Sequence, residues 1–288
     1  MVNFDRQYRL SIGPAGGKGF MVGEGENPLR ISFSLDKADT TTQNEATISV
    51  WNLNKEHKAV LEKDDCLVVL SAGYGTNLAL AFCGAVTSSA TSQDGADMVT
   101  EIHVTDSLIE IRDTYISISY AGTINTKKIL QDIASKMGVG IVFAPKATFK
   151  DFLNGYTFVG QAKTALNKVC NSAGLEWSLQ NGVLQIKKPN TTITDMVYVL
   201  SPETGLLDIP TRLSQSAETA KDGNTTSKKN QTGWEVRYFM NLAIGVNDFV
   251  KLESKVATGY FKVNKIKING DNFGGEWTCT AELLEVKV

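Results

Sequence analysis

Cysteine and histidine are scarce in this sequence, which has four of the first and two of the second in 288 residues. His57 and His103 stand alone, because neither has a second histidine four positions away. The cysteines are Cys66, Cys83, Cys170 and Cys279. None of them forms a Cys-x-x-Cys pair with another, and each has apolar neighbours in the sequence. We therefore expect buried free thiols, with neither a zinc centre nor a disulfide framework.

Net charge and long apolar runs are also lacking. Lysine and arginine number 29 against 31 aspartates and glutamates, so no net basic field is available to hold nucleic acid or anionic lipid. No run of about 18 apolar residues occurs, and residues 1–10 have no apolar core of a signal peptide. We expect a protein made in the cytoplasm, without a membrane span.

The first part of the chain alternates apolar and polar residues, as a half-buried strand does. The pattern recurs along this segment, at residues 29–35, 46–51, 66–72, 78–86 and 98–104. A short helix is predicted at 55–63, with Asn54 as its N-cap. Residues 1–119 are therefore predicted to form a first antiparallel β-barrel or sandwich domain.

The hydrophobic period changes from two to about 3.6 near Tyr120. Asn125 or Thr126 can cap a helix that ends at Gly138, and a second helix with an apolar stripe ends at Gly174. The dipeptide at 181–182 is Asn-Gly, which favours a two-residue hairpin turn between two strands. Residues 120–188 are predicted to form a small α+β module.

The remaining segment, 189–288, has the alternation of strands again. Strands are predicted at 196–200, 234–239, 249–253, 260–268 and 277–285. Residues 214–233 contain two alanines as their only apolar residues, so this stretch is predicted to be a mobile excursion. The expected fold is mainly β, with two antiparallel β-barrel or sandwich domains flanking the α+β module.

No catalytic, cofactor-binding or metal-binding residue is predicted. The glycine-rich stretch 13–19 contains Gly-Lys but has Ile12 and Gly19 where a phosphate-binding loop needs glycine and a hydroxyl residue. Asp64 and Asp65 are adjacent and point apart, unlike a pair of glycosidase carboxylates. Cys170 lies on the apolar stripe of a helix, which favours a buried thiol over a nucleophile.

Two other residue sets favour structural interpretations. The tryptophans are dispersed and suit core or interface anchoring better than a stacking platform; they are Trp51, Trp177, Trp234 and Trp277. The weak basic tract of Lys221, Lys228 and Lys229 is predicted to be solvated.

Several motifs together resemble phage baseplate hub proteins. The strand ATISVWNLN (46–54), a short helix, and the strands LVVLSAGY (67–74) and LAFCGAV (80–86) resemble the first domain of that family. The second half is similar through LSPETGL (200–206), Pro210, Asn241-Leu242, VKL (250–252), GYFKV (259–263), Gly270-Asp271 and Glu276-Trp277. The likeness covers nearly the whole chain.

The resemblance implies a non-enzymatic structural hub that needs no cofactor. It implies a homotrimer with two tube-type barrels per subunit, which would join a six-fold tail tube to a three-fold central spike and let DNA pass. Implied partners are the tail tube protein, the central spike protein, other baseplate proteins and a tape measure protein. The implied location is the virion tail baseplate, assembled in the host cytoplasm, and the near-zero charge suggests a neutral or acidic lumen.

The sequence leaves three alternatives open. The 120–188 module has a β/α pattern seen in small binding domains, so the chain could be a peptidoglycan-binding tail-tip protein. A tail-tip hydrolase would need converging carboxylates or a metal cluster, which the sequence does not suggest. A distal-tail or tube component of a non-contractile tail would differ in symmetry, with six-fold in place of three-fold rings.

Overall fold

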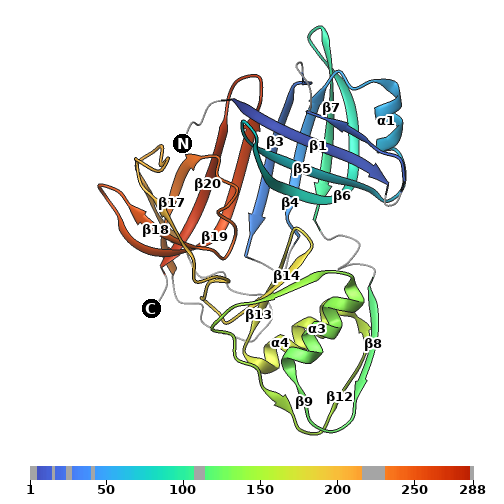
Figure 1. The fold of residues 1–288 in the computed structure, drawn as a ribbon, viewed down its shortest axis with the longest axis vertical. Coiled ribbons are helices and arrows are strands. Elements are labelled where there is room, and N and C mark those ends of the chain that lie inside the picture. Colours follow the sequence, from blue (N-terminus) through green and yellow to red (C-terminus); the bar gives the residue numbers. More distant parts are fainter. Residues whose placement is uncertain are drawn as a thin grey trace.

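The computed structural model describes residues 5–14, 17–23, 28–39, 43–106, 114–215 and 231–285. Strands dominate the described chain, and most of them belong to one large sheet, while two helices lie in a separate module (Figure 1). The predicted fold class, mainly β with a small α+β module, is confirmed.

The N-terminal β unit follows the predicted alternation closely. Along β3 (Ile31–Ala38), every second residue from Ile31 to Leu35 is buried, as expected for a strand with one face on a core. The other strands of this unit are β1 (Arg6–Pro14), β2 (Phe20–Val22), β4 (Glu45–Trp51), β5 (Cys66–Tyr74), β6 (Asn77–Asp94) and β7 (Asp97–Thr105). They pair in the order β3-β4-β7-β6-β5-β1-β2, with every pair antiparallel.

The short helix α1 (Lys55–Leu61) forms where it was predicted. The Asn54 side chain accepts a hydrogen bond from the His57 backbone N–H at 2.7 Å, which confirms Asn54 as the N-cap. Leu61 is buried and joins the core of the N-terminal β unit.

The C-terminal β unit continues the same sheet. Its strands are β15 (Val197–Leu200), β16 (Thr211–Gln215), β17 (Gln231–Phe239), β18 (Phe249–Glu253), β19 (Thr258–Asp271) and β20 (Trp277–Glu285). The pairing is antiparallel except between β15 and β18, which are parallel. The core residues of both β units belong to one continuous hydrophobic cluster.

The two β units are joined by hydrogen-bonded strand pairing between β3 and β19. Residues Lys265 to Asp271 of β19 pair with Ser32 to Ala38 of β3. A bulge between Val263 and Lys265 divides β19, so its first half pairs with β18 and its second half with β3. This β3–β19 pairing, the seam between the two β units, joins the first and last thirds of the chain.

The module has its own core, built from two helices, a three-stranded sheet (β10-β14-β13) and two two-stranded sheets. Helix α3 (Thr126–Met137) has Asn125 as its N-cap, and Gly138 ends it with φ 72°. Helix α4 (Ala162–Ala173) ends at Gly174 with φ 68°, in the left-handed conformation that glycine adopts freely. The strands are β8 (Tyr115–Tyr120), β9 (Ile124–Asn125), β10 (Gly140–Phe143), β11 (Asp151–Phe152), β12 (Tyr156–Gln161), β13 (Glu176–Gln180) and β14 (Val183–Lys187).

Short-range turn chemistry in the module agrees with the sequence. Asn181 and Gly182 have φ values of 50° and 76°, and they join the antiparallel pair β13 and β14. These positive values confirm the predicted two-residue hairpin turn. Strand β8 pairs with β12 of the module and not with the large sheet.

The predicted domain limits 1–119, 120–188 and 189–288 stay a prediction. Most of the predicted excursion, residues 216–230, lies outside the described residues, whereas its two ends belong to β16 and β17, where Leu213 pairs with Gly233. Within the described part of the chain, no helix is long and apolar enough to cross a membrane.

Candidate assembly edges and a groove in the module

A buried ion cluster lies where the two β units and the module meet. Asp39, directly after β3, accepts hydrogen bonds from Lys262 of β19 at 2.7 Å and from Lys187 of β14 at 2.8 Å. Lys187 is fully buried and also contacts Glu176 at 3.0 Å. Burial would raise the pKa of Asp39, but Lys262 and Lys187 outweigh it and hold that pKa below its usual value.

Neutral hydrogen bonds extend this junction. The Gln180 side chain donates to the Ala38 carbonyl at 2.9 Å and accepts from Asn44 at 2.9 Å. On the other side, the Asn247 amide donates to the Gln185 side-chain oxygen at 2.9 Å. The module is thus held against the β units through polar contacts, while its apolar core remains separate.

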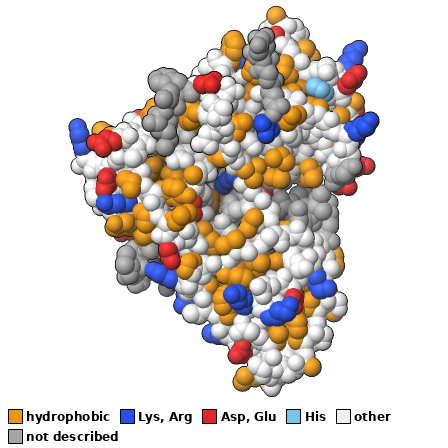
Figure 2. All heavy atoms as spheres, viewed as in Figure 1, with side chains coloured by type: hydrophobic (Ala, Val, Ile, Leu, Met, Phe, Trp, Pro, Cys, Tyr) orange, Lys and Arg blue, Asp and Glu red, His pale blue; other side chains and the backbone are white. Residues whose placement is uncertain are grey.

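A cavity of about 370 Å³ lies beside this junction. Figure 2 shows the surface hollowed between the β units and the module. Its walls are mostly aliphatic, from Leu80, Val183, Leu242, Ile244, Ile266 and Ile268. Lys37 also lines the cavity and donates a hydrogen bond to the Ala81 carbonyl. Burial lowers the pKa of Lys37 to about 8, although Asp106 acts in the opposite direction.

Replacing Lys37 with methionine is expected to stabilise the protein near neutral pH. The native chain binds the Lys37 proton more weakly than the unfolded chain does, so the free energy of unfolding should rise with pH between about 8 and 10.5. Lys37→Met should flatten that rise and raise the free energy of unfolding at pH 7 by about 1–3 kcal/mol. Urea unfolding at pH 7 and pH 10 measures both effects.

The exposed Lys267 provides the control for this change. Lys267→Met should leave the free energy of unfolding and its pH dependence within about 0.5 kcal/mol of the parent. An unchanged pH dependence in Lys37→Met would contradict the expectation.

Three strands at the ends of the large sheet lack a second neighbour among the described residues. They are β16, which pairs only with β17, β2, which pairs only with β1, and β15, which ends a side branch and pairs only with β18. In Figure 1, β17, the neighbour of β16, lies on the left of the molecule, and β1, the neighbour of β2, lies on the right, so these two ends lie in different parts of the molecule. Such edges present unpaired backbone groups to another chain.

Exposed apolar side chains accompany both ends. The C-terminal β unit exposes Met196, Val197, Val199, Leu207, Ile209 and Phe239, and Figure 2 shows hydrophobic side chains gathered over this unit. In the N-terminal unit, Met21 and Val69 are exposed and line a groove of about 410 Å³ between β1, β2 and β5. Clusters of exposed apolar residues mark candidate interaction surfaces.

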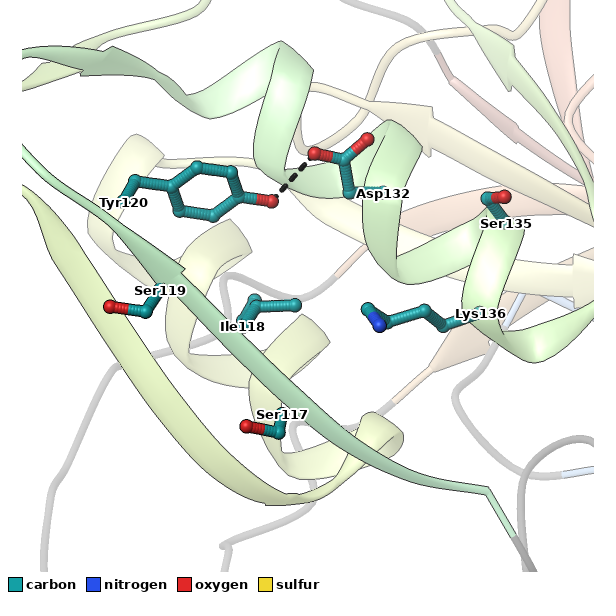
Figure 3. A pocket seen from close by; sticks show the side chains of 7 residues that line it. All are labelled: Ser117, Ile118, Ser119, Tyr120, Asp132, Ser135 and Lys136. Carbon is teal, nitrogen blue, oxygen red and sulfur yellow. Dashed lines mark hydrogen bonds between the residues drawn. The ribbon is translucent and has the colours of Figure 1, made fainter.

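A second groove, of about 390 Å³, lies in the module between β8 and α3 (Figure 3). Its lining is mostly polar and comprises Ser117, Ile118, Ser119, Tyr120, Asp132, Ser135 and Lys136. The Tyr120 hydroxyl donates to Asp132 at 2.6 Å, and Lys128 contacts the other carboxylate oxygen at 2.6 Å. Burial would raise the pKa of Asp132, but these two hydrogen bonds outweigh it and lower that pKa.

No family model matches this chain, and no curated protein matches it in sequence. Among solved structures, a 43 kDa tail protein of prophage MuSo2 from Shewanella oneidensis matches with a TM-score of 0.64 and 10% identity. That match covers 98% of this chain and 100% of the other. A tail protein from Neisseria meningitidis MC58 matches with a TM-score of 0.60 and 12% identity, over 97% of each chain. The chain has the fold of a phage tail protein.

A third match widens the group that shares this tail-protein fold. An E. coli component of the type VI secretion system, described as structurally similar to the T4 bacteriophage tail proteins gp27 and gp5, matches with a TM-score of 0.59 and 10% identity. The match covers 92% of this chain and 76% of that protein. The predicted resemblance to the hub family is therefore confirmed for the fold.

Within the tail-protein fold, the residues considered for chemistry lie apart in unrelated contacts. His57 of α1 stacks on Phe20 with ring centroids 4.1 Å apart, and His103 of β7 pairs with Glu101 at 2.9 Å. Burial raises the pKa of the Cys170 thiol to about 12, so this thiol is not ionised near neutral pH. In the described ranges, no group of three or more metal-ligating side chains occurs.

The remaining candidates also occupy structural positions. Gly13 lies in β1 and pairs with Leu67, and Gly19 directly precedes β2, while residues 15–16 of the glycine-rich stretch lie outside the described residues. Asp64 and Asp65 are exposed in the turn before β5. Lys221, Lys228 and Lys229 lie outside the described part of the chain.

One wall of the groove has a clear signal in the sequence. Residues 115–120 read YISISY, an unbroken alternation that indicates a strand with one polar face. The Asp39 cluster had no such signal, because its members come from three distant segments.

Proposed function

We propose that three copies of this chain form a ring at the tip of a phage-type tail. In this proposal the N-terminal β unit (β1–β7) and the C-terminal β unit (β15–β20), which lie within the predicted limits 1–119 and 189–288, are two tube-type units. Three chains then present six units to a tube above and three-fold symmetry to a spike below. The role is structural, without catalysis, and the location is the tail baseplate of a virion or related particle.

Two of the free ends of the large sheet, β16 and β2, carry this proposal. An edge on one side of a subunit can pair with a different edge on its neighbour, which is a head-to-tail contact. Such contacts close into a ring when the rotation between neighbours is a simple fraction of a turn. The free β16 and β2 edges supply two different surfaces of this kind.

The apolar residues near the two ends fit the same contact. Ile209, which is 73% exposed, lies between β15 and β16 in the C-terminal unit. The groove beside Met21 and Val69 in the N-terminal unit supplies an apolar surface on the other side. Burying about 800 Å² per partner is typical of specific interfaces, and both clusters would contribute.

Passage of DNA through such a ring restricts the charge of its inner wall. A basic wall would bind phosphates and release their counterions, which slows transit. The balance of 29 basic and 31 acidic residues is consistent with a neutral or acidic bore. A trimer structure with a bore lined by lysine and arginine would contradict this part of the proposal.

Replacing Ile209 with glutamate is expected to prevent ring formation without unfolding the chain. The parent protein should have a solution mass three times the chain mass of 31.3 kDa, whereas Ile209→Glu should stay monomeric at the same concentration. Light scattering coupled to size exclusion, together with thermal unfolding, measures both properties.

Leu153 in the module is equally exposed, at 73%, and lies away from both sheet ends. Leu153→Glu is therefore the matched control and should keep the trimer mass. If the parent stays monomeric at every concentration, alone and with a spike protein, the hub proposal fails. If both variants remain trimeric, the assigned contact is wrong while the ring stands.

A further inference from the structure

One edge of β8 has no strand beside it in the described structure. Strand β8 pairs with β12 and with no other strand. Figure 3 shows β12 on one side of β8 and α3 on the other, so the free edge faces the groove of about 390 Å³. The edge is therefore accessible from the groove.

One hydrogen bond shows which pairs of the β8–β12 ladder are hydrogen-bonded. The Ala162 N–H donates to the Thr114 carbonyl at 2.9 Å, immediately beyond the paired residues. Because hydrogen-bonded and non-hydrogen-bonded pairs alternate in antiparallel strands, Ser117 and Ser119 fall in non-hydrogen-bonded pairs. Their backbone N–H and C=O groups point away from β12.

The side chains support this assignment. Ser119 pairs with Thr157, and their hydroxyl groups are 3.0 Å apart. Side chains approach more closely in non-hydrogen-bonded pairs, as this contact requires. No other described segment supplies a backbone hydrogen bond to Ser117 or Ser119, so the outward groups on both residues are available.

The groove is also suited to a polypeptide by its side chains. Ser117, Ser119 and Ser135 are small, and an added strand lies about 4.8 Å from its neighbour. Asp132 is already neutralised by Lys128 and bonded to Tyr120. Lys136, exposed in the last turn of α3, also lines the groove and interacts electrostatically with Asp132 without a close ion pair. Lys128 and Lys136 together outnumber Asp132 by one, so one net positive charge remains at the groove.

We propose that the free edge of β8 binds an extended acidic segment of another protein as an added β-strand. The outward backbone groups of Ser117 and Ser119 bond to that segment, and Lys136 pairs with one of its carboxylates. Strand addition derives affinity from main-chain bonds and specificity from side chains beside the edge. This surface lies in the module, so its use does not depend on ring formation.

The test uses the full chain and two fluorescein-labelled octapeptides. Both peptides have a sequence of alternating threonine and valine in which two positions are replaced. These two positions are glutamate in the first peptide and lysine in the second, its twin. In fluorescence anisotropy, the glutamate peptide should bind the parent at least about tenfold more tightly than its twin. Absence of saturable binding of the glutamate peptide overturns the proposal.

Proline substitutions separate the two edges of the β8–β12 pair. Ser117→Pro removes an outward N–H of β8 and no ladder bond, so the glutamate peptide should bind about tenfold more weakly. Val159 is the cross-strand partner of Ser117 and is 75% exposed. Val159→Pro is the matched control, because it removes the corresponding outward N–H from the opposite edge. This variant should bind the glutamate peptide as tightly as the parent does. Equal weakening by both variants overturns the proposal.

A charge reversal keeps the proposal testable if proline disturbs the module. Lys136→Glu should invert the preference, so that the lysine peptide binds more tightly than the glutamate peptide. Circular dichroism should show a thermal midpoint no more than a few degrees below that of the parent, because Lys136 is exposed and the new glutamate is only modestly unfavourable beside Asp132 in the last turn of α3. An unchanged peptide preference in this variant would also overturn the proposal.

Discussion

Replacing Asp39 with alanine is expected to lower the free energy of unfolding by about 3–5 kcal/mol. Asp39 is the shared acceptor for two buried ammonium groups, at 2.8 Å from Lys187 and 2.7 Å from Lys262. Without it, the two cations repel one another in a dry site, and only the half-exposed Glu176 remains near Lys187. The loss is large because a buried charge without its partner costs far more than an exposed one.

A second substitution tests whether the loss is electrostatic. In the double variant Asp39→Ala with Lys262→Met, one cation is removed together with the anion, so part of the stability should return. Urea unfolding of the parent, the two single variants and the double variant gives the coupling energy. If the decrease in the free energy of unfolding of the double variant equals the sum of the decreases in the two single variants, then lost packing, and not unpaired charge, explains the effect.

The same site has a definite acid dependence. The native pKa of Asp39 is below its unfolded value, so its stabilisation is fully present above about pH 4 and is lost as pH falls through the native pKa. The single variant Asp39→Ala lacks this contribution at every pH. The difference in free energy of unfolding between parent and variant should therefore shrink below about pH 4.

Replacing Gly270 with valine is expected to cost about 2–4 kcal/mol by forcing apart the seam between the β units. A Cβ on Gly270 would lie 2.2 Å from Cζ of the Phe33 ring, its partner across the β3–β19 pairing. Phe33 is buried and packs edge-on against Trp277 with ring centroids 5.5 Å apart. The ring has to leave this position for the new side chain to fit.

Gly274 is the matched control, since a Cβ there would meet nothing within 4 Å. Gly274→Val should change the thermal midpoint by only a degree or two, as expected for an exposed turn position. Combining Gly270→Val with Phe33→Ala should cost less than the sum of the two, because the second change vacates the space that the first needs. Strict additivity would mean that the ring and the glycine do not compete for the same space.

Local structure in this chain was predictable from short stretches of sequence. The alternation at 29–35 and 46–51 marks strands whose inner faces are buried, and Asn54, Gly138 and Gly174 mark helix ends where caps form. These features depend on residues next to one another in the chain, which is why spacing alone is enough.

Long-range pairing was not predictable in the same way. Nothing in β3 or β19 indicates that one pairs with the other, because both read as ordinary half-buried strands and more than two hundred residues separate them. Asp39 likewise looks like a turn residue until Lys187 and Lys262 are placed beside it. For the groove, the alternation at 115–120 predicts a strand, but the absence of a neighbour on one edge appears only in the folded module.

The seam between β3 and β19 also makes the order of synthesis important. Residues 32–38 leave the ribosome long before residues 265–271, with which they pair. At about 5–20 residues per second, β3 waits roughly 10–45 s for its partner. During that interval the unpaired edge of β3 can pair with a strand from another nascent chain. The nascent protein is therefore more prone to aggregate than the folded protein, in which β19 covers this edge.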